Sequence, residues 1–174
     1  MISNQPLLVP IQPEESNFQQ FIDLYKSAFP KVERRSEEKL ISMIDNPRFY
    51  PNIILLENQF IGLFNYWNFD SFYYLEHFAL EKSHRNQGFG KKVLHGFIKE
   101  KAVVLECELP LNETSEKRLQ FYSELGFLSF PYKYIQPPYS HEHQLIELLL
   151  LTNNFNTDES TFNQLRTTIA EHVY

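Results

Sequence analysis

The feature that most constrains the fold is a pair of glycines, Gly88 and Gly90, between a hydrophobic run and a helix-like run in HRNQGFGKKVL. The chain has only five glycines, so two of them this close together indicate a local requirement of the backbone. Glycine tolerates positive φ and close approach to the main chain, and the free N–H groups that open a helix attract anions. The stretch therefore predicts either a tight turn or a strand–loop–helix unit that binds phosphate, with Arg85 and Lys91 adding positive charge.

Two familiar phosphate loops do not fit this stretch. A dinucleotide fold needs G-x-G-x-x-G early in the chain with an acidic residue about twenty positions later, and a Walker loop needs G-x-x-x-x-G-K-[ST]. Here only G-x-G is present, in mid-chain, and it follows Arg-x-x. The residues alone therefore leave a phosphate loop of another kind and a plain turn both open.

Length and charge narrow the possible classes of protein. The 174 residues suit a single domain spanning 1–174, long enough to bury a core without covalent cross-links. A formal net charge of −6 argues against nucleic acid as a partner, because phosphate binding needs a positive surface. The single cysteine, Cys107, excludes an internal disulfide, and we interpret it as a buried thiol rather than a nucleophile.

No targeting or membrane segment is expected. No run approaches the ~18 apolar residues that a bilayer-spanning helix needs. The first residues also lack the basic segment and long apolar segment of a signal peptide. We therefore expect a cytoplasmic protein, monomer or homodimer, that does not bind a membrane.

Hydrophobic periodicity predicts a mixed α/β (α+β) domain built around one sheet. Three apolar runs separated by short turns, at 48–58, 59–69 and 71–80, predict an antiparallel meander. Ser36 is expected to cap the second helix and Gly126 to end the fourth. Further strands are predicted at 6–11, 102–109, 127–135 and 143–152, and helices at 14–29, 34–46, directly after Gly90, and at 112–127 and 158–174.

Three stretches together resemble the GNAT N-acetyltransferase superfamily. Residues 85–90 (RNQGFG) are similar to the family's R/Q-x-x-G-x-G/A loop, and 74–80 (YLEHFAL) resemble its fourth strand. Residues 118–127 (RLQFYSELGF) resemble the helix that commonly ends in a Leu-Tyr-Glu-Lys-Leu-Gly-Phe type sequence. The match is close over 72–130, and the order of elements extends it loosely over nearly the whole chain. The resemblance implies a GNAT-type fold, with a central twisted, mostly antiparallel sheet of about seven strands flanked by helices.

The same resemblance implies acetyl-CoA as co-substrate and assigns residues to it. In the family the glycine loop wraps the pyrophosphate, the strand pairs through its main chain with the pantetheine arm, and a main-chain N–H of that strand polarises the thioester carbonyl. Ser115 departs from the pattern, because many relatives carry there an asparagine that touches CoA. The residues expected to bind acetyl-CoA are Phe78, Ala79, Leu80, Arg85, Asn86, Gln87, Gly88, Phe89, Gly90, Lys91 and Ser115.

Acetyl transfer to an amine needs a base, because an alkylammonium has a pKa near ~10.4 and attacks only after losing a proton. Glu76 is the expected base: strand alternation places Tyr74, Glu76, Phe78 and Leu80 on one face, and apolar surroundings raise a carboxyl pKa. A water chain could carry the proton. The alternative is a structural Glu76 that pairs with an arginine or caps backbone N–H groups. His77 is expected on the opposite face as a satisfied sheet histidine.

The departing thiolate benefits from an acid. Tyr122 matches the family's tyrosine that points at the sulfur of CoA, and this resemblance implies that it protonates the leaving group. The alternative is a core aromatic, because Tyr122 is in helical phase with Leu119 and Leu125.

The acceptor site is less defined. Glu106 and Glu108 share one face of a strand and are expected to bind a cationic amine, to replace Glu76 as base, or to form an exposed polar face. The resemblance implies that the loop joining the first two helices lines the acceptor cleft, so Glu33 is expected there. Arginines 34 and 35 in the same loop are expected either to hold a substrate carboxylate or to lie in solvent. Tyr134 belongs to a proline-rich segment that is expected to form a cleft wall.

The leading hypothesis is an acetyltransferase acting on a primary amine of a small molecule by direct attack in a ternary complex, without a metal. His141 and His143 flank Glu142, but two histidines without a supporting cluster do not make a metal site. One alternative acceptor is a protein N-terminus or lysine. Another class of function is an acyl-CoA-binding sensor that does not turn over.

Overall fold

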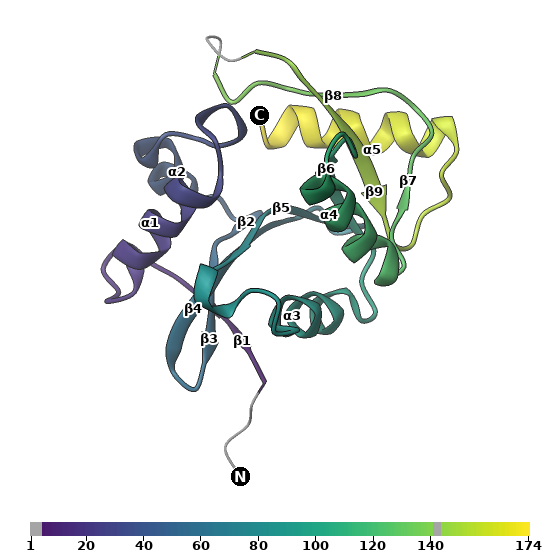
Figure 1. Cartoon of the computed structure of the whole chain (residues 1–174). Coiled ribbons are helices and arrows are strands. Elements are labelled where there is room, and N and C mark those ends of the chain that lie inside the picture. Colours follow the sequence, from purple (N-terminus) through teal and green to yellow (C-terminus); the bar gives the residue numbers. More distant parts are fainter. Residues whose placement is uncertain (1–4, 141–143) are drawn as a thin grey trace.

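The computed structural model describes residues 5–140 and 144–174, and in it helices cover both faces of one sheet (Figure 1). The strands are β1 Leu7–Pro10, β2 Phe49–Tyr50, β3 Asn52–Leu56, β4 Gln59–Asn68, β5 Tyr73–Leu80, β6 Val103–Glu108, β7 Leu128–Ser129, β8 Tyr134–Gln136 and β9 Ile146–Thr152. The helices are α1 Phe18–Ala28, α2 Glu37–Met43, α3 Phe89–Ile98, α4 Glu113–Glu124 and α5 Glu159–His172, with short 3₁₀ turns at Lys31–Glu33 and Lys82–His84.

The strand order is β1-β3-β4-β5-β6-β9-β7, with β2 also paired to β4 and β8 to β9. All pairs are antiparallel except β5 with β6, which confirms the predicted fold class. Two predicted strands are each divided in two. Pro51 separates β2 from β3, and Pro131 lies between β7 and β8, because proline cannot donate to a ladder.

Local sequence explains where the helices begin and end. The Ser36 hydroxyl accepts from the Lys39 N–H at the start of α2, as predicted. Gly126 adopts a φ of 88° directly after α4, a conformation that glycine adopts without strain. Helix α1 begins at Phe18 rather than at residue 14, because the preceding residues form turns closed by main-chain hydrogen bonds.

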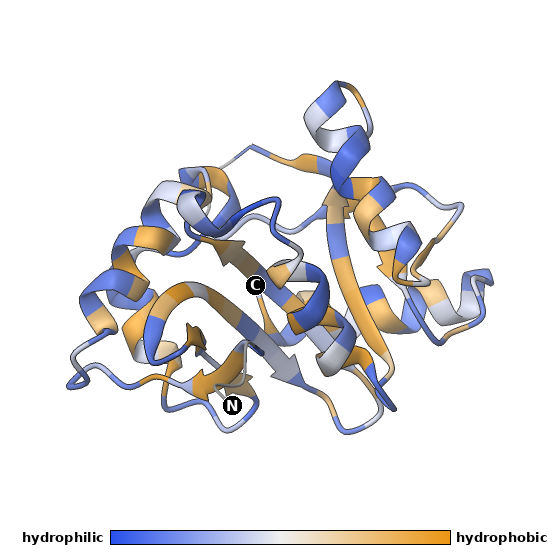
Figure 2. Cartoon of the chain, turned by 60° about the horizontal axis from the view of Figure 1, so that its bottom comes forward, coloured by the Kyte–Doolittle hydropathy of each residue, from blue (hydrophilic) through white to orange (hydrophobic). Residues whose placement is uncertain are grey.

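Each face of the sheet has its own hydrophobic core. Helices α1, α2 and α5 pack on one side through residues such as Phe21, Leu40 and Ile169. Helices α3 and α4 pack on the other through residues such as Leu94 and Tyr122. Figure 2 shows long hydrophobic stretches on several strands, whereas hydrophobic and hydrophilic residues alternate along the helices. None of the helices in the described ranges is long and apolar enough to cross a membrane.

A β-bulge interrupts the pairing of β4 with β5. Asn65 lies opposite His77 and the next residue, Tyr66, lies opposite Leu75, so Glu76 has no partner on β4. An extra residue of this kind breaks the alternation of side chains along its strand.

The bulge changes which side chains share a face. Glu76 and His77 both lie on the α1 side of the sheet, with Tyr74, whereas Phe78 and Leu80 pack with the α3 side. The prediction that Tyr74, Glu76, Phe78 and Leu80 share one face, with His77 opposite, is therefore wrong. The available signal was the pair of adjacent polar residues inside an otherwise apolar strand, which strict alternation would have placed on opposite sides.

Candidate active site

Strands β5 and β6 separate in the middle of the sheet, and we call this separation the split. Their parallel pairing ends at Leu75 with Leu105, although β5 continues to Leu80. Strand β6 goes on to pair with β9 on its other side. Among the described residues, the edge of β5 that faces β6 therefore has no strand partner beyond Leu75, and it can pair with an extended ligand.

The glycine loop ends at the start of α3, beside this split. Gly88 is the N-cap of α3 with a φ of 80°, and Asn86 also has a positive φ of 59°. The predicted need for positive φ therefore holds for Gly88 but not for Gly90, which is already helical. A Cβ at Gly90 would lie 3.5 Å from Phe78, an ordinary contact. The first N–H groups of α3 lack helical partners and carry the positive end of the helix dipole.

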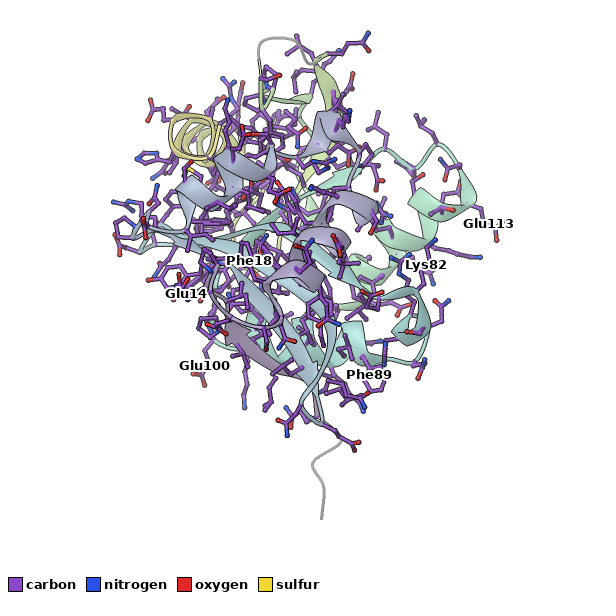
Figure 3. The ribbon with its side chains drawn as sticks, turned by 90° about the vertical axis from the view of Figure 1, so that its left-hand side faces the viewer. Glu14, Phe18, Lys82, Phe89, Glu100 and Glu113 are labelled. Carbon is purple, nitrogen blue, oxygen red and sulfur yellow. The ribbon has the colours of Figure 1, made fainter. Side chains whose placement is uncertain are left out.

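Side chains of the loop hold its shape. Arg85 Nε donates to the Leu80 carbonyl at 2.8 Å, and Gln87 Nε2 donates to the Ser83 carbonyl at 2.6 Å. Lys91 forms an exposed ion pair with Glu124 of α4, with Nζ and Oε2 3.3 Å apart. Figure 3 shows the loop and the starts of α3 and α4, marked by Lys82, Phe89 and Glu113, on one side of the molecule.

Ser115 is part of the cap of α4. Its hydroxyl accepts from the N–H groups of Leu111 and Asn112 and donates to the Asn112 carbonyl, while its own N–H donates to the Asn112 side chain. Ser115 is 4% exposed. The structure therefore gives this residue a capping role. The hydroxyl proton that the predicted contact with CoA would use is already donated to the Asn112 carbonyl.

Tyr122 lies on the α3 side of the sheet, close to β6. Burial, with the neighbouring Cys107, raises the pKa of its hydroxyl, and Arg118 and Glu108 also lie near it. The side chain packs in the core, yet 9% of the residue is exposed. The description of Tyr122 as a core aromatic is confirmed. Cys107 is buried, as predicted, and burial raises the pKa of its thiol to about 11.

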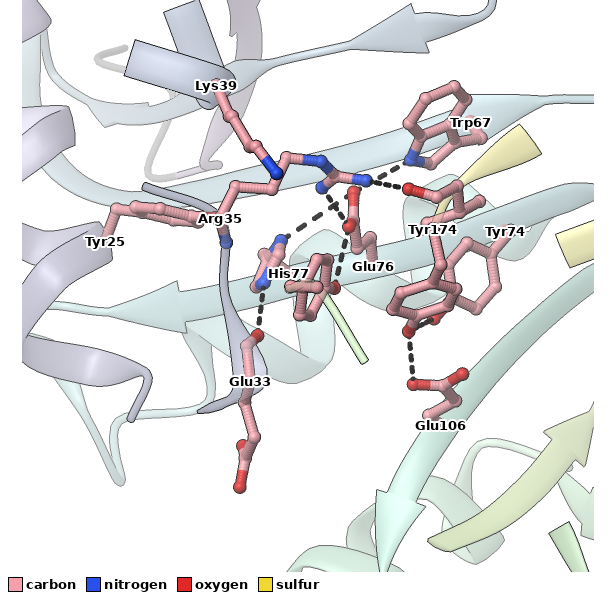
Figure 4. A network of polar contacts seen from close by, with 12 residues as sticks. Tyr25, Glu33, Arg35, Lys39, Trp67, Tyr74, Glu76, His77, Glu106 and Tyr174 are labelled. Carbon is pink, nitrogen blue, oxygen red and sulfur yellow. Dashed lines mark hydrogen bonds and ion pairs between the residues drawn. The ribbon is translucent and has the colours of Figure 1, made fainter. Parts of the chain in front are cut away.

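Glu76 is the centre of a buried polar network on the α1 side (Figure 4). Its carboxylate pairs with Arg35 and accepts from Trp67 Nε1 at 2.8 Å and from the Tyr139 hydroxyl at 2.7 Å. Burial by itself would raise the pKa of Glu76, but the Arg35 guanidinium and the hydrogen bonds from Trp67 and Tyr139 hold it below its usual value. The predicted rise in pKa is therefore wrong, and the pairing with an arginine that the alternative predicted is observed.

Arg35 also differs from its predicted setting. It is 5% exposed, and besides Glu76 its guanidinium donates to the Val173 carbonyl, so it cannot hold a substrate carboxylate. His77 joins the same region, because its Nε2 donates to the Glu33 carbonyl at 3.1 Å. Burial lowers the pKa of His77, so the ring is neutral. The contacts of Arg35 with Glu76 and of His77 with Glu33 attach the connection between α1 and α2 to the bulge of β5.

Glu106 is a second buried carboxylate, on the α1 side of β6. It accepts from the Tyr134 hydroxyl, from Gln136 Nε2 at 2.6 Å and from the Tyr174 hydroxyl at 2.9 Å. Burial raises the pKa of Glu106 despite these donors. The prediction that Glu106 forms an exposed polar face is wrong, and Tyr134, 3% exposed, is part of the core rather than an open cleft wall.

Glu108 and Glu33 lie near the outer part of the split. Glu108 forms an ion pair with Arg118 of α4. Burial is the main cause that raises the pKa of Glu33. Glu108 lies close enough to raise this pKa further, and Arg118 lies close enough to lower it. The structure thus brings Glu33 and Glu108 together, from the α1–α2 connection and from β6.

No group of His, Cys, Asp and Glu side chains able to hold a metal ion is found within residues 5–140 and 144–174. The pattern formed by His141, Glu142 and His143 lies outside the described residues.

A mostly antiparallel sheet that opens between two parallel strands, with a helix start beside the opening, matches the architecture expected of a GNAT-type acyltransferase domain. The model of a family described as "Acetyltransferase (GNAT) family" matches residues 18–127. The chain belongs to this family and is an acetyltransferase that takes its acetyl group from acetyl-CoA. The RNQGFG loop and the helix that ends at Gly126 both lie within the matched range.

Solved structures agree with this assignment. A GNAT-family acetyltransferase from Bacteroides thetaiotaomicron is 31% identical, with a TM-score of 0.91 over 97% of this chain and 98% of that one. A chimera of spermidine N-acetyltransferase from Vibrio cholerae is 12% identical, with a TM-score of 0.64 over 85% and 94%. Naa50 from Arabidopsis thaliana, in complex with the bisubstrate analogue CoA-Ac-MVNAL, is 13% identical, with a TM-score of 0.61 over 87% and 99%. The search of curated proteins found no match.

Proposed function

We propose that this protein transfers the acetyl group of acetyl-CoA to a primary amine of a small molecule, by direct attack in a ternary complex. The observation that carries the proposal is the proximity of Glu33 and Glu108 beside the split. Carboxylates beside the split attract an ammonium group and steer it toward a thioester held on β5. The fold alone does not choose the acceptor, since the distant neighbours include a spermidine acetyltransferase and a structure with a peptide-bearing analogue.

We further propose how the donor lies. The pyrophosphate binds the N–H groups around Gly88 and Gly90 at the start of α3, where the helix dipole favours negative charge. The pantetheine arm pairs with the free edge of β5 from Phe78 to Leu80, so that the thioester reaches the point where β5 and β6 part. A main-chain N–H at this point polarises the thioester carbonyl.

Tyr122 is the proposed acid. A tyrosine hydroxyl of ordinary pKa is already protonated at neutral pH, and burial raises the pKa of Tyr122 further, so the hydroxyl carries a proton for the departing thiolate. The same arrangement favours an enzyme over an acyl-CoA sensor, since a sensor needs the glycine loop but not a protonated donor beside the sulfur.

The experiment is a CoA-release assay with two matched panels. One holds small primary amines, from ethylamine to diamines and polyamines, and the other holds peptides with free N-termini or lysines. Turnover with the first panel and not the second supports the proposal, whereas the reverse assigns a protein acceptor. Binding of acetyl-CoA with no turnover in either panel supports the sensor.

A further inference from the structure

The connection between α1 and α2 is attached to the bulge of β5 at two points. The His77 imidazole donates to the Glu33 carbonyl at 3.1 Å, and the Arg35 side chain pairs with Glu76. The main-chain N–H of Arg35 also donates to the Tyr25 hydroxyl at 2.9 Å. Residues 33–35 therefore have a fixed position relative to the strand that would hold the thioester.

The side chain of Glu33 does not take part in this attachment. Figure 4 shows its carboxylate pointing away from Arg35, Glu76 and His77. Within the part of the chain that the structure describes, we find no hydrogen bond or ion pair to this carboxylate. The charged groups that face it are Glu108 on β6 and Arg118 on α4, and Arg118 is already paired with Glu108.

The other carboxylates at the split are occupied. Both oxygens of Glu76 accept hydrogen bonds, from Arg35, Tyr139 and Trp67. Both oxygens of Glu106 accept as well, and Glu108 pairs with Arg118. Of these four acidic residues, Glu33 is the one whose carboxylate has no hydrogen bond or ion pair among the described residues, whereas Glu108 has one oxygen on Arg118.

We propose that Glu33 is the general base of the reaction and that His77 is the residue that positions it. The assignment rests on the proposed function, because it concerns deprotonation of an acceptor amine. Partial burial and the nearby Glu108 also raise the pKa of Glu33 toward the range in which a carboxylate accepts protons efficiently.

An N–H bond of the ammonium breaks and its proton passes to Glu33, which later releases it to solvent. The free electron pair of nitrogen forms a bond to the thioester carbonyl carbon, and the C–S bond breaks. The second proton that nitrogen loses balances the proton received by the departing thiolate, so acetamide, CoA thiol and one solvent proton result.

The test compares Glu33→Gln with Glu38→Gln, an exposed carboxylate at the start of α2, using two probe amines. Ethylamine is an ammonium ion at pH 7, whereas 2,2,2-trifluoroethylamine is neutral and needs no base. We expect Glu33→Gln to lower kcat/KM for ethylamine by about a hundredfold or more, with the loss shrinking as pH rises. The loss should nearly vanish for trifluoroethylamine, and Glu38→Gln should match wild type.

A purely electrostatic role for Glu33 would give a different result, because an ion pair at a partly exposed carboxylate changes binding by less than about tenfold. A loss of that size, or a pH profile parallel to wild type, overturns the assignment while leaving the function intact. If wild type binds acetyl-CoA but acetylates no amine, the proposed function fails and the base assignment fails with it.

The positioning role of His77 is tested by measuring kcat of two His77 variants. His77→Leu cannot donate to the Glu33 carbonyl, whereas His77→Gln retains a donor. We expect His77→Leu to lower kcat and His77→Gln to restore much of it, with no further loss when His77→Leu is added to Glu33→Gln. Additive losses in the double variant would show that His77 acts independently of Glu33.

Discussion

Arg35 and Glu76 lie 41 positions apart in the sequence and form a buried ion pair that joins the start of α2 to the bulge of β5. Both side chains are almost inaccessible to solvent, at 5% and 0% exposed. A buried carboxylate persists in its charged form only when a cation and hydrogen-bond donors compensate it. The pair therefore explains why the glutamate in mid-strand serves the structure, and why the base is to be sought elsewhere.

The first prediction concerns the anion site. Gly88→Asp should weaken acetyl-CoA binding by at least about a hundredfold, equivalent to about 2.7 kcal/mol, because a carboxylate would lie where the pyrophosphate binds. Gly88→Asn is the matched control, since asparagine has the same shape without charge and tolerates the positive φ at this position. Calorimetric titration of both variants measures the difference. Equal affinities in two folded variants would show that RNQGFG is an ordinary turn.

The second prediction concerns Tyr122. Removing its hydroxyl in Tyr122→Phe should lower kcat by about a hundredfold, the usual contribution of an acid, with little change in the dissociation constant of acetyl-CoA. The ring that packs in the core is retained, so the melting temperature should change little. Steady-state kinetics and titration separate the two quantities. Unchanged turnover across the pH range would leave Tyr122 as a core aromatic only.

The third prediction concerns the pH dependence of stability. The folded-state pKa of Glu76 is lower than its unfolded value of about 4.3. The ion pair therefore stabilises the protein fully above that pH, and the contribution is lost as pH falls through the folded value. At pH 7, Glu76→Gln should cost about 3–5 kcal/mol, because it leaves Arg35 buried without a countercharge. Urea unfolding should show this difference narrowing below pH 4, and a constant difference would contradict the pairing.

The fourth prediction concerns Glu106, whose contribution to stability changes with pH in the opposite direction. Burial raises the folded-state pKa of Glu106, so the folded protein holds its proton more tightly than the unfolded chain does. The stabilising contribution is complete below the unfolded pKa of about 4.3 and is lost as pH rises through the folded value. Relative to wild type, Glu106→Gln should therefore become more stable as pH rises from 4 toward 7. A stability difference that does not vary over this range would show that Glu106 is ionised normally.

The fifth prediction separates capping from cofactor binding at Ser115. Ser115→Ala removes a hydroxyl that serves the start of α4, and loss of such a cap costs about 1 kcal/mol. For a chain of this length the melting temperature should fall by about 2–4 °C. The affinity for acetyl-CoA should not change. A weaker affinity with an unchanged melting temperature would instead support direct contact with CoA.

Periodicity and short motifs by themselves determined most of the architecture. The meander, the helix that follows the glycines and the cap at Ser36 are local features, set by side-chain spacing and backbone preferences that the sequence shows directly. The divisions at Pro51 and Pro131 are local as well, because a proline has no N–H to donate, although the apolar runs by themselves predict unbroken strands there. The RNQGFG loop and the helix ending at Gly126 were sufficient to indicate the family.

The arrangement of the acidic residues was decided only by the tertiary structure. The bulge shifts His77 to the same face as Glu76, and a bulge depends on how two strands pair rather than on either strand alone. The partners of the carboxylates, Arg35 for Glu76 and Tyr174 for Glu106, come from segments far away in the chain. The ionisation of a carboxyl group is set by burial and by such neighbours, so the sequence showed which acids were present but not what each one does.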